Sequence, residues 1–315
     1  LAVMNKRVFP RKVILTLSVI VIMAMFPLKV AYSQVPPQYK GDVFQGTYLR
    51  VGVNDYGVLG IVHDSEDIGF QYPNGSQYES LAVGWWGDGW SVFYGENSAG
   101  FSPDDGSWGT ISSVSPTTSL TYDKYGIVKT CVIRTDDGQL EITFKFRFMY
   151  DKKFLILAMF VKNIGTTTIT DLEVKKIVDW DVWQPTLGDY DNFWGMDNIR
   201  RPNMNLVVAF INSSASTGIL RPVYMGFASR EKPTDYHLDW DDYLERGIYS
   251  PYKISLSYKG TSPDFFDGCA VYQWLLGNLK PGETKTLHFV YSAGDTLEEL
   301  EKNVAQGLKM VVTIR

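Results

Sequence analysis

One uninterrupted apolar segment, Phe154 to Val161, constrains most strongly how this 315-residue chain can fold. A run without polar residues is typical of a strand that is covered on both faces, as in the middle of a sandwich. Asn163 and Gly165 mark a turn directly after it, because both residue types tolerate positive φ. An extended, β-branched segment follows, so the sequence predicts a central β-hairpin.

The neighbouring segments extend this core. Leu140 to Phe148 alternates apolar and polar residues at every position, as a half-buried strand does. After the turn, the alternation shifts by one residue at Lys175 and Lys176, and a β-bulge is the usual physical cause of such a shift. We therefore expect the segment 140–182 to form the shared interior of two layers of strands.

Composition and the C-terminus complete the predicted fold. Aromatic residues make up 14% of the chain, which favours strands, and 28 Gly and 14 Pro supply many turns. Thr296 and Glu299 form a capping box before an apolar stripe that ends near Gly307, and Lys309 to Arg315 is expected to return as a last strand. The prediction is an all-β protein: a large antiparallel β-sandwich with one C-terminal helix.

The N-terminus has the pattern of a secretory signal peptide. A basic region is followed by an apolar run over 13–26 and by small residues around Ala31 to Ser33. We expect residues 1–33 to be the signal peptide and 34–315 to be one β-sandwich domain of a secreted, extracellular or cell-surface protein. Only if the segment is retained would it act as a membrane anchor.

Charge limits the partners of the exported chain. Residues 1–33 hold five basic residues and no acidic one, so their removal changes the formal net charge from −5 to −10. Contacts to the phosphates of a nucleic acid need an excess of Lys and Arg over acidic residues, so we expect no nucleic-acid partner.

The chain has two cysteines, Cys131 and Cys269. In an exported protein they could form one disulfide, and the alternative is two buried thiols. Their spacing excludes a CxxC redox or zinc pair.

Acidic residues gather after the central hairpin. Asp179 and Asp181 would lie on one side of a strand, with Cα atoms roughly 6–7 Å apart. Asp189 and Asp191 follow in a short loop. Hard oxygen ligands of this kind suit calcium, although the spacing differs from that of an EF-hand. The sequence therefore suggests a calcium site, with a solvated acidic loop as the alternative.

Tryptophans beside acids suggest a carbohydrate ligand. Indole rings stack on the apolar faces of sugars while carboxylates accept hydrogen bonds from hydroxyl groups. The candidate ligand-binding residues are Trp183, Trp194, Trp240, Asp239 and Asp241. The alternative is that these rings fill the end of the sandwich.

Catalytic templates are mostly missing from the sequence. The three histidines, His63, His237 and His288, have no metal-binding spacing, and no nucleophile elbow or phosphate-binding loop occurs. A glycosidase needs two carboxylates about 5–10 Å apart. Asp179 with Asp181, or either of them with Asp239 or Glu245, could meet that distance, but we assign no catalytic residue.

Three stretches carry a family resemblance: TYLRVGVNDYGVLGIV, LEITFKFRFMYDKKFLILAMFVKNIGTTTI and LGNLKPGETKTLHFVYSAGDTLEEL. Together with the size of the chain, they resemble the β-supersandwich of galactose-mutarotase-like domains, including those attached to exported glycoside hydrolases. The resemblance implies a fold and, more distantly, sugar chemistry. The His and Glu pair of true mutarotases cannot be placed in this sequence.

Three functions from different classes follow. The first is an exported binding or surface-structural protein whose acidic, aromatic loops contact carbohydrate, with calcium ordering them. The second is a carbohydrate-active enzyme, a glycoside hydrolase or mutarotase-like protein, or a domain derived from one. The third is a subunit of an extracellular assembly in which edge strands pair between copies.

Overall fold

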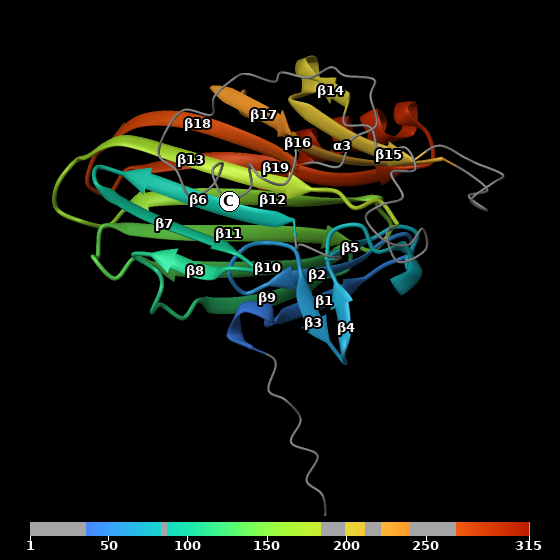
Figure 1. Cartoon of the computed structure of the whole chain (residues 1–315), viewed down its shortest axis with the longest axis horizontal. Coiled ribbons are helices and arrows are strands. Elements are labelled where there is room, and N and C mark those ends of the chain that lie inside the picture. The colour runs from blue at the N-terminus through green and yellow to red at the C-terminus, as the bar shows by residue number, and fades with distance from the viewer. Residues whose placement is uncertain (1–35, 83–86, 184–198, 212–221, 240–268, 315) are drawn as a thin grey trace, which may run out of the picture. The chain divides into compact units, whose positions relative to one another are not determined.

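The computed structural model describes residues 36–82, 87–183, 199–211, 222–239 and 269–314, which form a body of antiparallel strands (Figure 1). The largest sheet has eight strands in the order β14 (Ile199–Arg201), β15 (Leu206–Ile211), β16 (Val223–Ser229), β19 (Thr284–Gly294), β12 (Phe154–Asn163), β11 (Leu140–Met149), β10 (Gly126–Arg134) and β9 (Thr117–Asp123). The predicted all-β class is confirmed.

The second large sheet has six strands in the order β17 (Asp235–Asp239), β18 (Cys269–Leu279), β13 (Ile169–Asp179), β6 (Asp88–Tyr94), β7 (Asn97–Ser102) and β8 (Gly106–Gly109). A three-stranded sheet, β1 (Gly41–Gln45), β2 (Arg50–Asn54) and β5 (Phe70–Gln71), and the ribbon of β3 (Ile61–His63) and β4 (Glu66–Ile68) complete the strands of the described residues. The 3-10 helices are η1 (Pro37–Tyr39), η2 (Ser76–Tyr78), η3 (Pro202–Met204) and η4 (Val311–Thr313).

The two large sheets share one hydrophobic core. Phe144 and Phe146 reach it from the eight-stranded sheet, and Trp90, Val174 and Tyr272 reach it from the six-stranded sheet. Strand β11 alternates buried and half-buried residues along its length, as its sequence predicted. The apolar alternation of β11 therefore fixes which of its faces is turned inward.

Strand β12 is covered on both faces, as its apolar run predicted. Leu155 and Leu157 belong to the central core. Phe154 and Ile156 lie on the opposite face, in a cluster with Val290 and Val311. Helix α3 (Leu297–Met310) packs on that outer face. At Gly307 an added Cβ would lie 2.7 Å from Val290 Cγ1, so the helix requires a glycine at this contact.

The predicted central hairpin is wrong in its pairing. Strand β12 pairs with β11 and β19, whereas β13 pairs with β18 and β6 of the other sheet. The turn at 163–165 therefore leads from one layer to the other instead of joining two neighbours in a sheet. The apolar pattern of both strands predicts that they are buried, but it does not predict which strands they pair with.

The predicted bulge at Lys175 and Lys176 is also wrong. The pairing of β13 with β18 is regular from Glu173 to Asp179, and the irregularity lies earlier, at 169–173, where Asp171 has φ +53°. Lys176 therefore points into the core together with Val174 and Val178. A shift was expected because Lys176 occupies a position that faces the core, where the alternating pattern would place an apolar residue.

Two further expectations need correction. Helix α3 continues to Met310 and passes into η4, so the segment after Gly307 is not a last strand. The Gly-, Ser- and Asp-rich composition of 101–109 is typical of a loop, but the segment contributes to β7 and forms β8. A four-residue strand with one apolar residue carries no hydrophobic period that would reveal it.

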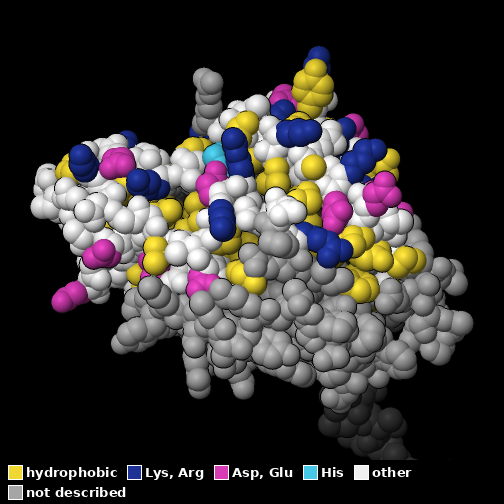
Figure 2. Space-filling view, turned by 90° about the horizontal axis from the view of Figure 1, so that it is seen from above, with side chains coloured by type: hydrophobic (Ala, Val, Ile, Leu, Met, Phe, Trp, Pro, Cys, Tyr) yellow, Lys and Arg dark blue, Asp and Glu magenta, His cyan; other side chains and the backbone are white. Residues whose placement is uncertain are grey.

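The described part of the face seen from above mixes charges of both signs with apolar groups (Figure 2). On α3, Glu301 Oε1 lies 2.8 Å from Arg201 Nε, so these opposite charges are paired. His288 Nδ1 is within hydrogen-bond distance of Glu231 Oε1, at 2.8 Å. No helix among the described residues is long and apolar enough to cross a membrane.

Candidate functional site

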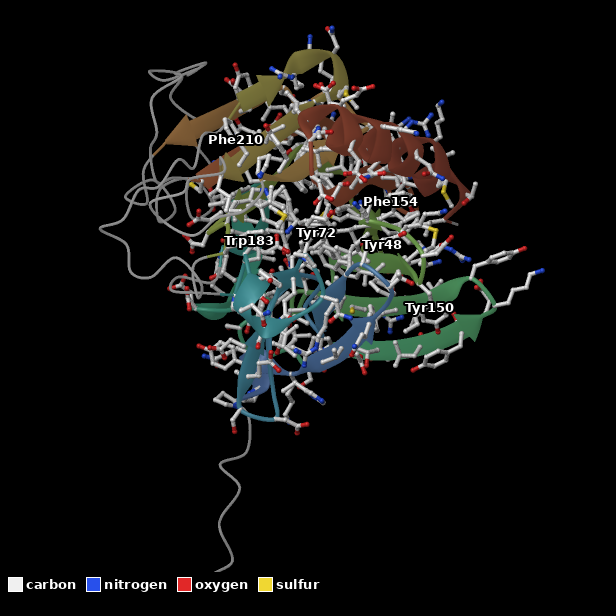
Figure 3. All side chains as sticks on the ribbon, turned by 90° about the vertical axis from the view of Figure 1, so that its right-hand side faces the viewer. Tyr48, Tyr72, Tyr150, Phe154, Trp183 and Phe210 are labelled. Atoms are coloured by element: carbon white, nitrogen blue, oxygen red, sulfur yellow. The ribbon has the colours of Figure 1, made fainter. Side chains whose placement is uncertain are left out.

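Four chain segments meet at one end of the sandwich around Lys153. Tyr48 lies between β1 and β2, Tyr72 follows β5, and Tyr150 follows β11. Asp295 and Glu299 lie at the start of α3. We call these residues together with Lys153 the Lys153 rim; its three tyrosines are labelled in Figure 3.

Lys153 is the centre of the rim. Its Nζ donates to Tyr72 Oη and to Glu299 Oε1, each at 2.7 Å, and lies 3.6 Å from Asp295 Oδ2. Burial opposes the charge of Lys153, but the bonds to Glu299 and Tyr72 outweigh burial and raise the pKa of Lys153 above that of an ordinary lysine. Lys153 therefore carries a fixed positive charge at neutral pH.

Tyr72 and the start of the helix hold this charge in place. The buried Tyr72 hydroxyl donates to Asp295 Oδ1 at 2.7 Å. Burial raises the pKa of Tyr72, the hydrogen bond from Lys153 opposes the rise, and Asp295 reinforces it. Glu299 Oε2 accepts from the Asp295 N–H at 2.8 Å, and the Thr296 hydroxyl caps the helix by accepting from the Glu299 N–H. The two carboxylates are thus positioned by the helix start.

The Tyr48 ring borders Lys153, and Tyr150 lies on the segment bonded to the Tyr48 loop; both tyrosines reach solvent. Tyr48 is 40% exposed and Tyr150 is 38% exposed. The Tyr48 ring lies 5.3 Å from Lys153 Nζ, and the loop that carries it is fixed by the Thr47 N–H, which donates to the Tyr150 carbonyl at 2.7 Å. The side chains of Lys153, Asp295 and Glu299 are 16%, 36% and 34% exposed. Aromatic faces and polar atoms are therefore accessible side by side.

Trp183 is buried and contacts Tyr72 of the Lys153 rim. It is 5% exposed, and its Nε1 donates to the Tyr72 carbonyl at 2.7 Å while its ring lies 4.9 Å from that of Tyr78. Trp183, Tyr72 and Tyr48 follow one another across this end of the molecule in Figure 3. Trp183 thus packs as a buried support, the alternative that the sequence left open, and is not an exposed stacking ring.

The predicted acidic residues lie at the end of β13. Asp179 and Asp181 are buried, and their N–H groups donate to the carbonyls of Gly87 and Ser80. Trp194, Trp240, Asp189, Asp191 and Asp241 lie outside the described residues. Among the described residues, no group of three or more His, Cys, Asp or Glu side chains could hold a metal ion. The calcium site stays a prediction.

Strand register brings one predicted pair together. Asp179 pairs with Cys269, and Cys269 pairs with Asp239, so the three residues form one row across β13, β18 and β17. Two strand spacings separate the two aspartates, which corresponds to about 10 Å between their Cα atoms.

The disulfide alternative is wrong: Cys131 and Cys269 are both buried thiols. Cys131 belongs to the central core between the large sheets, whereas Cys269 packs with Ile177 and Val271 on the other face of the six-stranded sheet. Because Cys269 points away from the central core that contains Cys131, the two sulfurs cannot meet.

The sequence did not reveal most of the Lys153 rim. Its members come from positions 48, 72, 150–153 and 295–299, and none of these segments matches a known binding motif. The one usable signal was the capping box, because it placed Glu299 at a helix start. Only the fold brings the other segments to that point.

Comparisons with known proteins relate the fold to carbohydrate-active proteins. No family model and no curated protein matches the sequence. The crystal structure of a bacterial glucoamylase complexed with acarbose matches 86% of this chain and 34% of its own, with 11% identity and a TM-score of 0.53. An alpha-mannosidase from Enterococcus faecalis V583 matches 85% of this chain and 31% of its own (9% identity, TM-score 0.45), and a polysaccharide lyase matches 84% and 34% (12%, 0.44).

The glucoamylase match shows a shared fold. This confirms the resemblance to β-sandwich domains of carbohydrate-active proteins. The chain spans about a third of the length of these solved structures.

Proposed function

We propose that this protein is exported and binds carbohydrate through the Lys153 rim. The observation that carries the proposal is the exposed Tyr48 ring beside Lys153, a lysine that two partly exposed carboxylates share, with the exposed Tyr150 on the segment that is bonded to the Tyr48 loop. A sugar presents apolar C–H faces and hydroxyl groups to its binding site. The rings would stack on the former, while Lys153 and the carboxylates would exchange hydrogen bonds with the latter.

The rim is fixed before a ligand arrives. Lys153 already contacts Tyr72, Asp295 and Glu299, and the Tyr48 loop is bonded to Tyr150. Little side-chain entropy would be lost on binding, which favours affinity. A site of this kind suits binding better than catalysis, because both carboxylates are engaged with a cation.

The shared fold supports the ligand class. The glucoamylase was crystallised with acarbose, and we extend only its broad ligand class, carbohydrate, to this chain. Export rests on the basic, apolar and small-residue pattern of 1–33, which lies outside the described residues.

The test begins with a glycan array probed with the full chain. For any ligand found, we expect Tyr48→Ala and Tyr150→Ala each to weaken binding about tenfold, which corresponds to about 1.4 kcal/mol. Lys153→Met should weaken it at least as much. Leu275→Ala is the control, since Leu275 is a 42% exposed apolar residue on β18, outside the rim. Absence of any glycan ligand, or equal affinity of the rim variants and wild type, would refute the proposal.

Calcium is part of the proposal for the loops beyond β13. Asp179 and Asp181 would provide ligands together with Asp189 and Asp191. We expect a chelator to lower the melting temperature and added calcium to restore it. Asp181→Asn should remove the response. A melting temperature that is indifferent to chelator contradicts the calcium site and leaves the Lys153 rim untouched.

A second candidate is a carbohydrate-active enzyme that uses the row of Asp179, Cys269 and Asp239. Backbone pairing of Asp179 with Cys269 and of Cys269 with Asp239 supports this candidate, because a Cα separation of about 10 Å is compatible with two carboxylates around a glycosidic bond. This candidate predicts release of reducing ends from a bound glycan and its loss in Asp179→Asn. Binding without release favours the first function.

A further inference from the structure

Strand β9 ends the eight-stranded sheet and is exposed along its length. Within the described residues, β9 pairs with β10 on one side and with no strand on the other. Six of its seven residues are exposed and Leu120 is half-buried against the core. A row of backbone N–H and C=O groups therefore faces outward on this edge.

The other sheet edges are shorter. Strand β14 has three residues, β8 has four and β17 has five. Natural proteins protect longer edges with lysine, proline or bulges. Strand β9 has none of these within Thr117–Asp123, and its register with β10 is regular throughout. Pro116 and Lys124 stand just outside the strand and limit the open edge to these seven residues.

The sequence of β9, TTSLTYD, suits strand pairing. Threonine and tyrosine have high β-propensity, and Thr–Thr and Thr–Ser pairs across strands are favourable. The single charged side chain, Asp123, lies at one end and is paired with Arg147. The middle of the edge therefore offers no charge that would repel an incoming strand.

We propose that β9 pairs with β9 of a second copy of this chain. An antiparallel pair with its twofold axis at Leu120 would place Thr118 opposite Tyr122 and Ser119 opposite Thr121. Asp123 would face Thr117 of the other copy, so no like charges would meet. The self-complementarity of β9 favours a second copy over an unrelated peptide, and the pair would join two eight-stranded sheets into one.

The proposed contact is small. Two seven-residue strands bury less than the roughly 1,200–2,000 Å² of a standard interface. The dimer should therefore be weak and dependent on concentration, and would bring two Lys153 rims into one assembly. Two linked rims would raise the apparent affinity for a repeating polymer, although neither rim makes a new contact with the polymer.

The test is sedimentation velocity of the full chain over a range of about 10–1,000 µM. The edge variant is Ser119→Lys with Thr121→Lys, because each lysine then faces a lysine of the other copy. We expect wild type to sediment faster as concentration rises and the edge variant to associate at least tenfold more weakly. The matched control, Thr166→Lys with Thr168→Lys, carries the same added charge on exposed turn residues and should behave like wild type.

A second variant with acidic substitutions distinguishes loss of strand pairing from loss of folding, because two misfolded variants would not associate when mixed. Ser119→Glu with Thr121→Glu should also be monomeric alone, and an equimolar mixture with the lysine variant should form a heterodimer. Wild type that stays monomeric over the whole range, or a lysine variant that associates as strongly as wild type, would overturn the proposal. Failure here would leave carbohydrate binding by single chains unaffected.

Discussion

At the scale of single residues, the core contains an ion pair that the sequence did not indicate. Lys176 Nζ bonds Asp88 Oδ1 and the Gly89 carbonyl. Asp88 also accepts from Tyr291 Oη at 3.1 Å and from the Leu59 N–H at 2.6 Å. Periodicity assigns charged residues to the solvent side, so an inward lysine was mistaken for a change of register. The partner on β6 is 88 positions away and could not be seen.

This pair predicts a large and asymmetric effect of substitution. Lys176→Met would leave Asp88 buried without its cation and should cost about 3–5 kcal/mol of the free energy of unfolding, measured with urea. Lys176→Met with Asp88→Leu should recover much of that loss. Lys152→Met, at the exposed pair with Asp151, is the control and should cost no more than about 1 kcal/mol. Equal effects at the two lysines would contradict a buried pair.

Tyr72 predicts how stability changes in alkali. Burial raises its pKa, so the folded state keeps a proton that the unfolded chain loses above about pH 10. The folded state then binds more protons, and the free energy of unfolding must fall as pH rises through that range. The raised pKa of Lys153 acts with the same sign.

Tyr72→Phe should therefore reduce the loss of stability between pH 9 and 11, in urea titrations at fixed ionic strength, by about 1 kcal/mol. Tyr122→Phe, at an exposed tyrosine, should leave the pH dependence as in wild type. The same slope in Tyr72→Phe and wild type would show that the Tyr72 hydroxyl does not stabilise the folded state as described.

At the scale of elements, local patterns predicted what is buried but not how strands pair. The alternation over Leu140–Phe148, the apolar run of β12 and the cap at Thr296 were all correct. The assignment of β12 and β13 to different sheets was missed, because both have the same apolar character and pairing is decided by distant strands. Strand β8 was missed because Gly and Ser carry no period.

Strand orientation predicts the behaviour of the cysteines. Burial raises the pKa of the Cys131 thiol to about 12, so little thiolate exists at neutral pH and the native thiol should react slowly. We expect a thiol reagent to modify neither cysteine within minutes in native buffer and both in denaturant. Reductant should leave the melting temperature unchanged. A drop in melting temperature with reductant would indicate a disulfide and would contradict the opposite faces of the two side chains.

Helix α3 predicts a measurable contribution from its cap. The Thr296 hydroxyl accepts from the Glu299 N–H at 3.1 Å, and the helix then packs Leu300 and Val304 on the outer face of the eight-stranded sheet. Thr296→Ala should cost about 0.5–2 kcal/mol of the free energy of unfolding. Gln306→Ala, on the exposed side of the same helix, should be neutral within about 0.5 kcal/mol. A neutral Thr296→Ala would show that the cap does not stabilise the helix.

At the scale of the whole molecule, the site depends on the joining of distant segments. The two sheets, the outer helix and the small sheet of β1, β2 and β5 bring Tyr48, Tyr72, Lys153 and Glu299 to one end. These residues span some 250 positions and share no local motif, so the sequence predicted the fold class but not this group of residues. Asp179 and Asp181 lie at and just after the end of β13, and the acidic site predicted there stays a prediction.

Carbohydrate binding at the Lys153 rim is the proposed function. The most direct measurement is a crystal structure of the protein with a glycan identified on the array. We predict that a sugar ring lies against Tyr48 or Tyr150 and that its hydroxyl groups contact Lys153, Asp295 or Glu299. A glycan bound at another part of the molecule, with the rim empty, would contradict carbohydrate binding by the Lys153 rim.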